Sequence, residues 1–358
     1  MTLRLPDIHA STRSYERWLA TQTAIVRRDL SRKHERMRES PFVFFRGTFY
    51  RWIEVWPLVC RELAAAPRVV AVGDLHLENF GTWRDLEGRL IWGVNDVDEA
   101  APLAYTNDLV RLATSAALAI HERHLRLRLR DACEAIVDGY AASLDRGGEA
   151  FVLAERHQWL HDVAVNKLRD PRRFWKAMQA LPRPSRPAPD DAKRALAALL
   201  PDPRGARDVR HRTAGVGSLG RPRFVALAEW EGGCLAREVK ACVRSAATRQ
   251  APSPGAAPAD LIAHAVRAPD PFWAIRGSWI VRRLAPDCSR IEIEDVPRTR
   301  DEGKLLRAMG WETANMHLAT RRAASTIARD LRRRSARWLE TAAAKMAEAT
   351  VADWNAWR

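Results

Sequence analysis

Residues 69–100 read VVAVGDLHLENFGTWRDLEGRLIWGVNDVDEA, and this stretch decides how the chain folds. Two short apolar runs rich in β-branched residues, 68–72 and 90–94, predict two buried strands. The turn-forming residues 85–88 lie between them, so we expect the two strands to form a hairpin. That hairpin would enclose the polar loop of residues 74–79.

Polar side chains stand directly after both predicted strands. Asp74 follows the first strand, Asn79 comes five residues later, and Asp96 and Asp98 follow the second strand. In phosphoryl transfer one carboxylate accepts the proton of the attacking hydroxyl, while an asparagine oxygen and a second carboxylate hold Mg²⁺ against the nucleotide phosphates. We therefore predict Asp74 as the catalytic base and Asn79 and Asp96 as metal ligands. Asp98 is either a second metal contact or a local hydrogen-bond acceptor, and turn capping alone would also suit these residue types.

A glycine-rich segment, GVGSLG at residues 215–220, follows much later in the chain. A glycine-rich turn between two strands lets backbone N–H groups approach nucleotide phosphates, and a lysine on a following strand can reach them. The predicted nucleotide-binding residues are Gly215, Gly217, Ser218, Gly220 and Lys240. A plain hairpin turn is the alternative, because this motif alone has low specificity. No helical glutamate is evident as a partner for Lys240, although Glu229, Glu231 and Glu238 lie nearby.

The motifs around these residues resemble those of a known enzyme superfamily. GDLH at residues 73–76 followed by Asn79, and NDVD at residues 95–98, resemble the motifs of the aminoglycoside-phosphotransferase and choline-kinase-like branch of the kinase superfamily. DLV at residues 108–110 resembles an Asp-Leu-Ala that this branch places some twelve residues after its metal-binding aspartate. The resemblance implies a two-lobed kinase-like fold, ATP and Mg²⁺ as cofactors, and Asp108 as a helix-start residue that braces the catalytic loop.

The sequence departs from that pattern at two places. Val72 stands where the branch usually has histidine, and Leu77 and Glu78 stand where it has Pro-Gly. These departures concern the class of substrate more than the metal site.

Two further residues are candidates for supporting roles. His76 could bind substrate or metal, although a histidine beside a metal loop is also suited to structural hydrogen bonding. Arg46 could reach a phosphate or brace an acidic residue of the site.

The chain as a whole is also similar to a widespread bacterial family known only as domain of unknown function 2252. The similarity lies in SPFVFFRG at residues 40–47, GDLHLENFG at 73–81, NDVDEA at 95–100 and the later GVGSLG. It covers most of the length but supplies no activity.

The order of the motifs has a consequence for the fold. The glycine-rich segment follows the Asp74 loop by about 140 residues, whereas it precedes the catalytic loop in an ordinary kinase. We therefore predict a helix-dominated α+β protein with a circularly permuted kinase-like fold of two lobes. The expected parts are a helical lead-in at 1–66, a catalytic helical lobe at 67–205, a β-rich nucleotide-binding lobe at 206–297, and C-terminal helices at 298–358 that pack on the catalytic lobe.

Hydrophobic periodicity supplies the elements of these parts. Helical spacing predicts helices at 11–38 and 48–65, then a succession of helices over 107–200. The predicted strands of the β-rich part are 209–216, 224–230, 235–242, 279–284 and 289–293, with a helix at 259–268.

The bulk composition narrows the class of protein. With 358 residues and 47% hydrophobic content the chain can bury a sizeable core, and no apolar run approaches the ~20 residues that span a bilayer. Its start lacks the apolar segment of a signal peptide, and its five cysteines are scattered. These features predict a soluble cytoplasmic protein without a membrane partner.

The net charge of +15 allows a polyanionic partner. Only seven lysines contribute, and the arginines are spread through helical segments such as 122–130 and 321–337. Such arginines form either solvated helix faces or a patch that contacts a polyanion or phosphate.

Several functions therefore remain open. The first is an ATP- and Mg²⁺-dependent phosphotransferase whose partners are a nucleotide and an unknown hydroxyl-bearing acceptor, and a nucleotidyl transferase or inactive nucleotide-binding relative is its nearest alternative. A metallophosphoesterase would explain GDLH, but the downstream histidines show no motif of that class. An arginine-rich nucleic-acid-binding protein is the third possibility.

Overall fold

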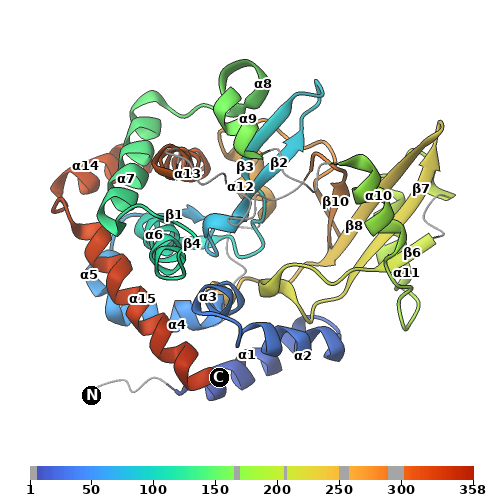
Figure 1. Ribbon diagram of the computed structural model, residues 1–358, viewed down its shortest axis with the longest axis horizontal. Coiled ribbons are helices and arrows are strands. Elements are labelled where there is room, and N and C mark those ends of the chain that lie inside the picture. Colours follow the sequence, from blue (N-terminus) through green and yellow to red (C-terminus); the bar gives the residue numbers. More distant parts are fainter. Residues whose placement is uncertain (1–5, 165–169, 205–207, 250–257, 289–301) are drawn as a thin grey trace.

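The computed structural model describes residues 6–164, 170–204, 208–249, 258–288 and 302–358. Within these ranges the chain forms fifteen α-helices and three small antiparallel sheets (Figure 1). A five-stranded sheet lies on one side of the molecule and most of the helices lie on the other. The predicted α+β class, dominated by helices, is confirmed.

The N-terminal region contains two helices where one was predicted. Helix α1 (Ile8–Gln22) is capped by Asp7, and α2 (Arg27–Arg36) follows after a break, so the single helix at 11–38 is wrong. At the break the N–H of Val26 donates a hydrogen bond to the carbonyl oxygen of Gly220 at 2.9 Å. The chain therefore bends to contact the glycine-rich segment.

The next helices bring aromatic side chains into the main core. Helix α3 (Pro41–Gly47) begins after Ser40, whose hydroxyl accepts a hydrogen bond from a backbone N–H of the first turn. Helices α4 (Phe49–Val59) and α5 (Arg61–Ala64) divide the predicted helix at 48–65, because the backbone of Cys60 leaves the helical region.

Two loops run side by side because of the strand pairing. Strand β1 (Arg68–Ala71) pairs with β4 (Ala101–Ala104), while β2 (Phe80–Arg84) pairs with β3 (Leu90–Val94), which also pairs with β5 (Phe151–Val152). The predicted hairpin of residues 68–72 with 90–94 is therefore wrong. Residues 80–84 read FGTWR, which is not an apolar run, although four of the five are buried. Both connections between the two sheets, 72–79 and 95–100, carry predicted site residues.

Long helices form the larger part of the molecule. They are α6 (Tyr105–His121), α7 (Leu129–Arg146), α13 (Glu302–His317), α14 (Ala324–Arg333) and α15 (Trp338–Trp357). Helix α13 packs closely on α7, where a Cβ at Gly139 would overlap the carbonyl oxygen of Arg307 and a Cβ at Gly310 would overlap that of Ile136. Helix α15 packs on α6, so the C-terminal helices contact the part that carries the two loops.

The five-stranded sheet has the order β6-β7-β8-β10-β9, and all its pairs are antiparallel. Its strands are β6 (Asp208–His211), β7 (Arg223–Trp230), β8 (Gly233–Ala241), β9 (Ala274–Arg276) and β10 (Trp279–Leu284). Strand β6 is shorter than the predicted 209–216, and the predicted strand at 289–293 lies outside the described residues. The remaining helices are α8 (Leu153–Arg156), α9 (Gln158–Ala164), α10 (Pro171–Gln179), α11 (Asp190–Ala197) and α12 (Pro258–His264).

The two faces of this sheet differ in character. Phe224 on β7 stands directly opposite Val239 on β8, so the two side chains point to the same face. There they form an apolar cluster with α11. Helix α11 thus packs on the sheet, and it lies within the predicted segment 67–205. The other face carries charged residues and turns toward the loops of residues 72–79 and 95–100.

No helix among the described residues is both long and apolar enough to cross a membrane.

Candidate functional site

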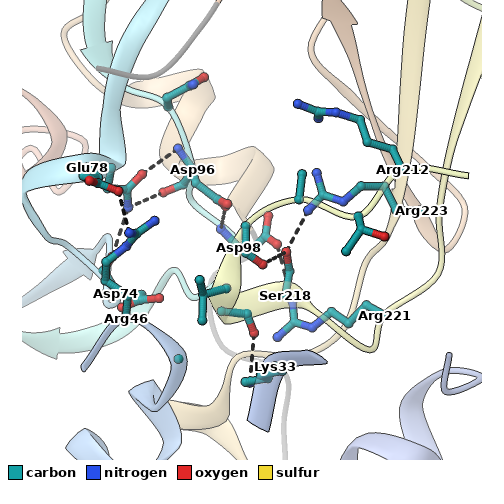
Figure 2. A pocket seen from close by; sticks show the side chains of 18 of the residues that line it. Lys33, Arg46, Asp74, Glu78, Asp96, Asp98, Arg212, Ser218, Arg221 and Arg223 are labelled. Atoms are coloured by element: carbon teal, nitrogen blue, oxygen red, sulfur yellow. Dashed lines mark hydrogen bonds and ion pairs between the residues drawn. The ribbon is translucent and has the colours of Figure 1, made fainter. Parts of the chain in front are cut away.

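A cavity of about 640 Å³ lies between the charged face of the sheet and the two loops (Figure 2). Its lining contains predicted site residues from both halves of the chain, namely Arg46, Asp74, His76, Asn79, Asp96, Asp98, Gly215, Gly217 and Ser218. Lys240 lines a smaller hollow together with Asp96 and Asp98. Gly220 and Asp108 do not line the cavity.

Asp74 is held by an arginine that the sequence analysis missed. Nε of Arg111 donates a hydrogen bond to Oδ1 of Asp74 at 2.9 Å, and a second guanidinium nitrogen donates to the same oxygen. Arg111 is fully buried on α6, with its guanidinium carbon 4.0 Å from the ring centre of Phe45. Burial raises the pKa of Asp74, and the charge of Arg111 opposes that rise. The second oxygen, Oδ2, faces Gly217, where an added Cβ would lie 3.5 Å from it.

Asp108 braces the loop that carries Asp74, as the resemblance implies. In the first turn of α6 its carboxylate accepts hydrogen bonds from the N–H of Val72 at 2.7 Å and from that of Gly73 at 3.0 Å. Nε2 of His317 lies 3.0 Å from the same carboxylate, and the whole group is buried. Gly73 has a φ of +83°, and a Cβ there would overlap a backbone oxygen, so only glycine suits this turn.

Asn79 ties the two loops together. Its side-chain nitrogen donates to the carbonyl oxygens of Asp74 at 3.0 Å and Asp96 at 2.9 Å, and Oδ1 accepts the N–H of Asp96 at 2.9 Å. An amide oxygen has two lone pairs, and one of them is engaged in this way. The residue thus has a structural task in addition to its predicted role as a metal ligand.

Lys240 reaches across from strand β8 to the acidic loop. Its ammonium lies 3.2 Å from Oδ2 of Asp96 and also forms an ion pair with Asp98. The carboxylate partners of Lys240 are therefore these two aspartates and not a glutamate. The side chain of Asp96 is 46% exposed and that of Asp98 11% exposed, so Asp96 is the more accessible of the two from the cavity.

The two aspartates have opposite pKa shifts. Loss of water inside the cavity acts to raise the pKa of Asp96, but the charges of Lys240 and Arg282 and the hydrogen bonding with Asp98 together outweigh it, and the net direction is downward. Burial, followed by the neighbouring charge of Asp96, raises the pKa of Asp98 to about 6. Both carboxylates are thus mainly ionised at neutral pH, and Asp98 is the first of the two to take up a proton as the pH falls.

The glycine-rich segment forms a tight turn over the site between β6 and β7. Gly215 and Gly220 have φ values of +72° and +95°, on either side of the short 3₁₀ turn Val216–Ser218. Two hydrogen bonds hold this turn in place. The hydroxyl of Ser218 accepts one from Arg223 at 2.7 Å, and the carbonyl oxygen of Gly217 accepts the other from Nζ of Lys33 at 3.2 Å.

Lys33 is a further residue that sequence reasoning did not single out. It is buried on α2, and burial, followed by the charge of Arg221, lowers its pKa to about 8. Its amine fixes the glycine-rich turn to the N-terminal helices.

Arg46 braces an acidic residue, which was one of the two roles predicted for it. Its guanidinium forms an ion pair of 2.5 Å with Glu78, and both side chains are buried. Glu78 is one of the positions at which the sequence departs from the kinase-like motif. His76 lines the same part of the cavity.

The donor set at the acidic end suits Mg²⁺. Carboxylates of Asp96 and Asp98 and the amide oxygen of Asn79 are hard oxygen donors, and Mg²⁺ is commonly bound through one or two carboxylates plus substrate phosphates. The ammonium of Lys240 lies between the two carboxylates, at the place where their negative charges converge. Within the described part of the chain, no group of three or more His, Cys, Asp or Glu side chains forms a metal-binding cluster.

The chain matches one known family over nearly all its length. No curated protein and no solved structure was found to match it. Residues 26–186 and 189–358 match the family described as "Uncharacterized protein conserved in bacteria (DUF2252)". These two segments make up far more than half of the chain, which therefore belongs to this bacterial family.

Proposed function

We propose that this protein is a Mg²⁺-dependent phosphotransferase that moves a phosphoryl group from an ATP-type nucleotide to a hydroxyl. The observation that carries the proposal is the meeting of Lys240 with Asp96, since these residues are 144 positions apart in the chain. A lysine on a strand that follows a glycine-rich turn, facing a metal-binding aspartate, is the arrangement that phosphoryl transfer uses.

Each group has a defined task in this proposal. Asp74, oriented by Arg111, accepts the proton of the acceptor hydroxyl at Oδ2. Asp96 and Asn79 would hold Mg²⁺, which neutralises charge on the phosphates when it is bound. The glycine-rich turn and Lys240 bind the phosphate chain. Lys240 would exchange an aspartate for a phosphate oxygen as the nucleotide enters.

The fold that accompanies this function is a permuted kinase-like arrangement. Two features support it: the sheet that carries the glycine-rich turn follows the Asp74 loop in the chain, and the two nevertheless line one cavity. Helix α1 also lies beside α15, with Nε2 of His9 3.0 Å from the carbonyl oxygen of Ala356. Described segments near both ends of the chain thus meet away from the cavity.

The test is thermal stability with ATP, with and without Mg²⁺. A ligand that binds only the folded state raises the melting temperature, and a hundredfold excess over the Kd adds about 2.7 kcal/mol. We expect a shift that needs both ATP and Mg²⁺, and we expect Asp96→Asn to lose it. Asp145→Asn, which changes an exposed aspartate on α7, should keep it. Absence of any shift with the unchanged protein would contradict the proposal.

The same protein can separate phosphoryl transfer from nucleotidyl transfer. ATP labelled at the γ phosphate should pass its label to an acceptor fraction, while label at the α phosphate should stay with the nucleotide. The opposite result would assign AMP transfer. Binding of nucleic acid that falls steeply with salt and is unchanged in Asp74→Ala would instead favour a polyanion-binding function.

A further inference from the structure

A single buried glutamate on the cavity-facing side of the sheet is surrounded by three arginines. Oε1 of Glu238 accepts hydrogen bonds from Arg223 at 2.7 Å and from Nε of Arg282 at 2.8 Å, and Oε2 is paired with Arg212. The side chain of Glu238 is only 1% exposed. We call Arg212, Arg223 and Arg282 the arginine cluster.

The strand register explains why these four residues meet. Glu238 on β8 stands opposite Arg282 on β10 and opposite Val225 on β7, and Arg223 stands opposite Lys240 two residues further along β8. Side chains two residues apart share a face of a strand. The cluster and Lys240 are therefore on the same face of the sheet, beside the glycine-rich turn.

The cluster has more positive charge and more donors than its glutamate can satisfy. Three guanidiniums carry about fifteen N–H donors, while one carboxylate offers about four acceptor positions. Burial acts to raise the pKa of Glu238, but the charges of the three arginines outweigh it and hold that pKa well below its usual range. The group therefore carries two excess positive charges at neutral pH.

The surplus points into the cavity. All three arginines line it, and the side chains of Arg212 and Arg282 are 24% and 25% exposed. Figure 2 shows Arg212 and Arg223 on the wall that faces Asp96 and Asp98. Arg223 in addition donates to Ser218 of the glycine-rich turn, so the cluster is held in a fixed position relative to that turn.

We infer that the arginine cluster binds phosphate oxyanions of a polyphosphate, and that it does so without a metal ion. Planar guanidiniums with paired N–H donors match the geometry of phosphate oxygens, and a buried glutamate keeps them in place when no anion is bound. The inference rests on the proposed function, because it names the groups that hold the phosphate chain in that site. It assigns to side chains a task that the sequence had assigned to the backbone of the glycine-rich turn and to Lys240.

The experiment measures binding of sodium tripolyphosphate by titration calorimetry in the presence of EDTA. Removing one charged hydrogen-bonding partner should weaken binding by about tenfold or more, so Arg212→Met and Arg282→Met should each lose at least this much. Arg276→Met is the matched control, since Arg276 is an exposed arginine of the same sheet away from the cavity. Arg223→Met is avoided because Arg223 is buried. Equal affinity in all these proteins would overturn the inference.

Two further arms separate this inference from the proposed function and separate the sources of phosphate. In the first arm, the cluster variants lose tripolyphosphate binding, while the unchanged protein shows no Mg²⁺-dependent rise in melting temperature with ATP. This result would support the phosphate-binding role of the cluster and contradict the proposed nucleotide site. A normal ATP shift that is abolished by Asp96→Asn but unaffected by Arg212→Met would overturn the cluster alone. Competition of tripolyphosphate by ATP but not by a sugar phosphate would assign the site to the nucleotide, and the reverse would assign it to a phosphorylated acceptor.

Discussion

At the scale of single residues, the pair of Arg111 and Asp74 shows how the charge of a carboxylate can be compensated inside a protein. Water is largely excluded from Asp74, and a carboxylate in such surroundings tends to take up a proton. Arg111 supplies the compensating charge from within the core, and it contacts only one of the two oxygens. The other oxygen is directed toward the turn that covers the cavity.

Removal of this arginine should therefore destabilise the protein. Arg111→Met leaves a buried charge without its partner, and breaking such a pair costs about 3–5 kcal/mol. Arg111→Lys keeps the charge and should lose less. Urea unfolding of the three proteins measures the difference. An Arg111→Met protein with an unchanged free energy of unfolding would show that Asp74 is not held as an ion.

The residue scale also explains what could be predicted from the sequence. Asp74, Asn79 and Asp96 lie within one short stretch, and Lys240 was conspicuous because the chain has only seven lysines. Arg111 and the arginine cluster could not be identified in this way, because arginine is abundant throughout the chain. Their partners are distant in sequence, and the net charge of +15 says nothing about which arginines face inward.

At the scale of elements, helices α7 and α13 cross at an unusually short distance. The glycines at this crossing permit backbone contact that any side chain would prevent. The strand pairing could not be predicted, because β1 pairs with β4, which is not the next strand in the chain, and β2 lacks an apolar pattern. Helix periodicity identified the long helices more readily than the register of short strands.

We expect Gly139→Ala to destabilise the protein, since a methyl group at this crossing forces the two helices apart. Overpacking of a core typically costs about 1–3 kcal/mol. Gly303→Ala on α13 is the control, because nothing lies within 4 Å of a Cβ there. Alanine is the better helix former by up to about 1 kcal/mol, so this control should gain stability or be neutral. Thermal unfolding compares the two, and equal melting temperatures would contradict the packing described.

At the scale of the whole molecule, one buried glutamate on helix α13 links the helical part to strand β3 of the three-stranded sheet. Glu312 of α13 accepts a hydrogen bond from the N–H of Val94 at 3.1 Å and another from Asn315 at 2.8 Å. Burial raises the pKa of Glu312 to about 7, and the charge of Arg267 opposes the rise. The folded state thus favours the protonated form of this side chain.

The stability of the protein should then contain a component that falls as pH rises. Because the pKa of Glu312 is higher in the folded than in the unfolded chain, its favourable contribution is complete below pH ~4.3 and is lost by about pH 7. Glu312→Gln removes this dependence, so the variant should gain on the unchanged protein by up to about 3 kcal/mol between pH 4 and pH 8. Glu348→Gln at an exposed position should show no such gain. Urea unfolding at both pH values measures it, and parallel behaviour of the two variants would refute the shift.

The distance in sequence between the two walls of the cavity also has a consequence for biosynthesis. A ribosome delivers Asp96 144 residues before Lys240, and Asp98 two residues after Asp96, so the growing chain must carry both carboxylates without their ammonium partner for much of its translation. Helix α13, which packs on α7, emerges later still. We expect a nascent chain stalled before β8 to remain sensitive to protease in the segment of residues 72–100, and to become protected once β10 has left the exit tunnel.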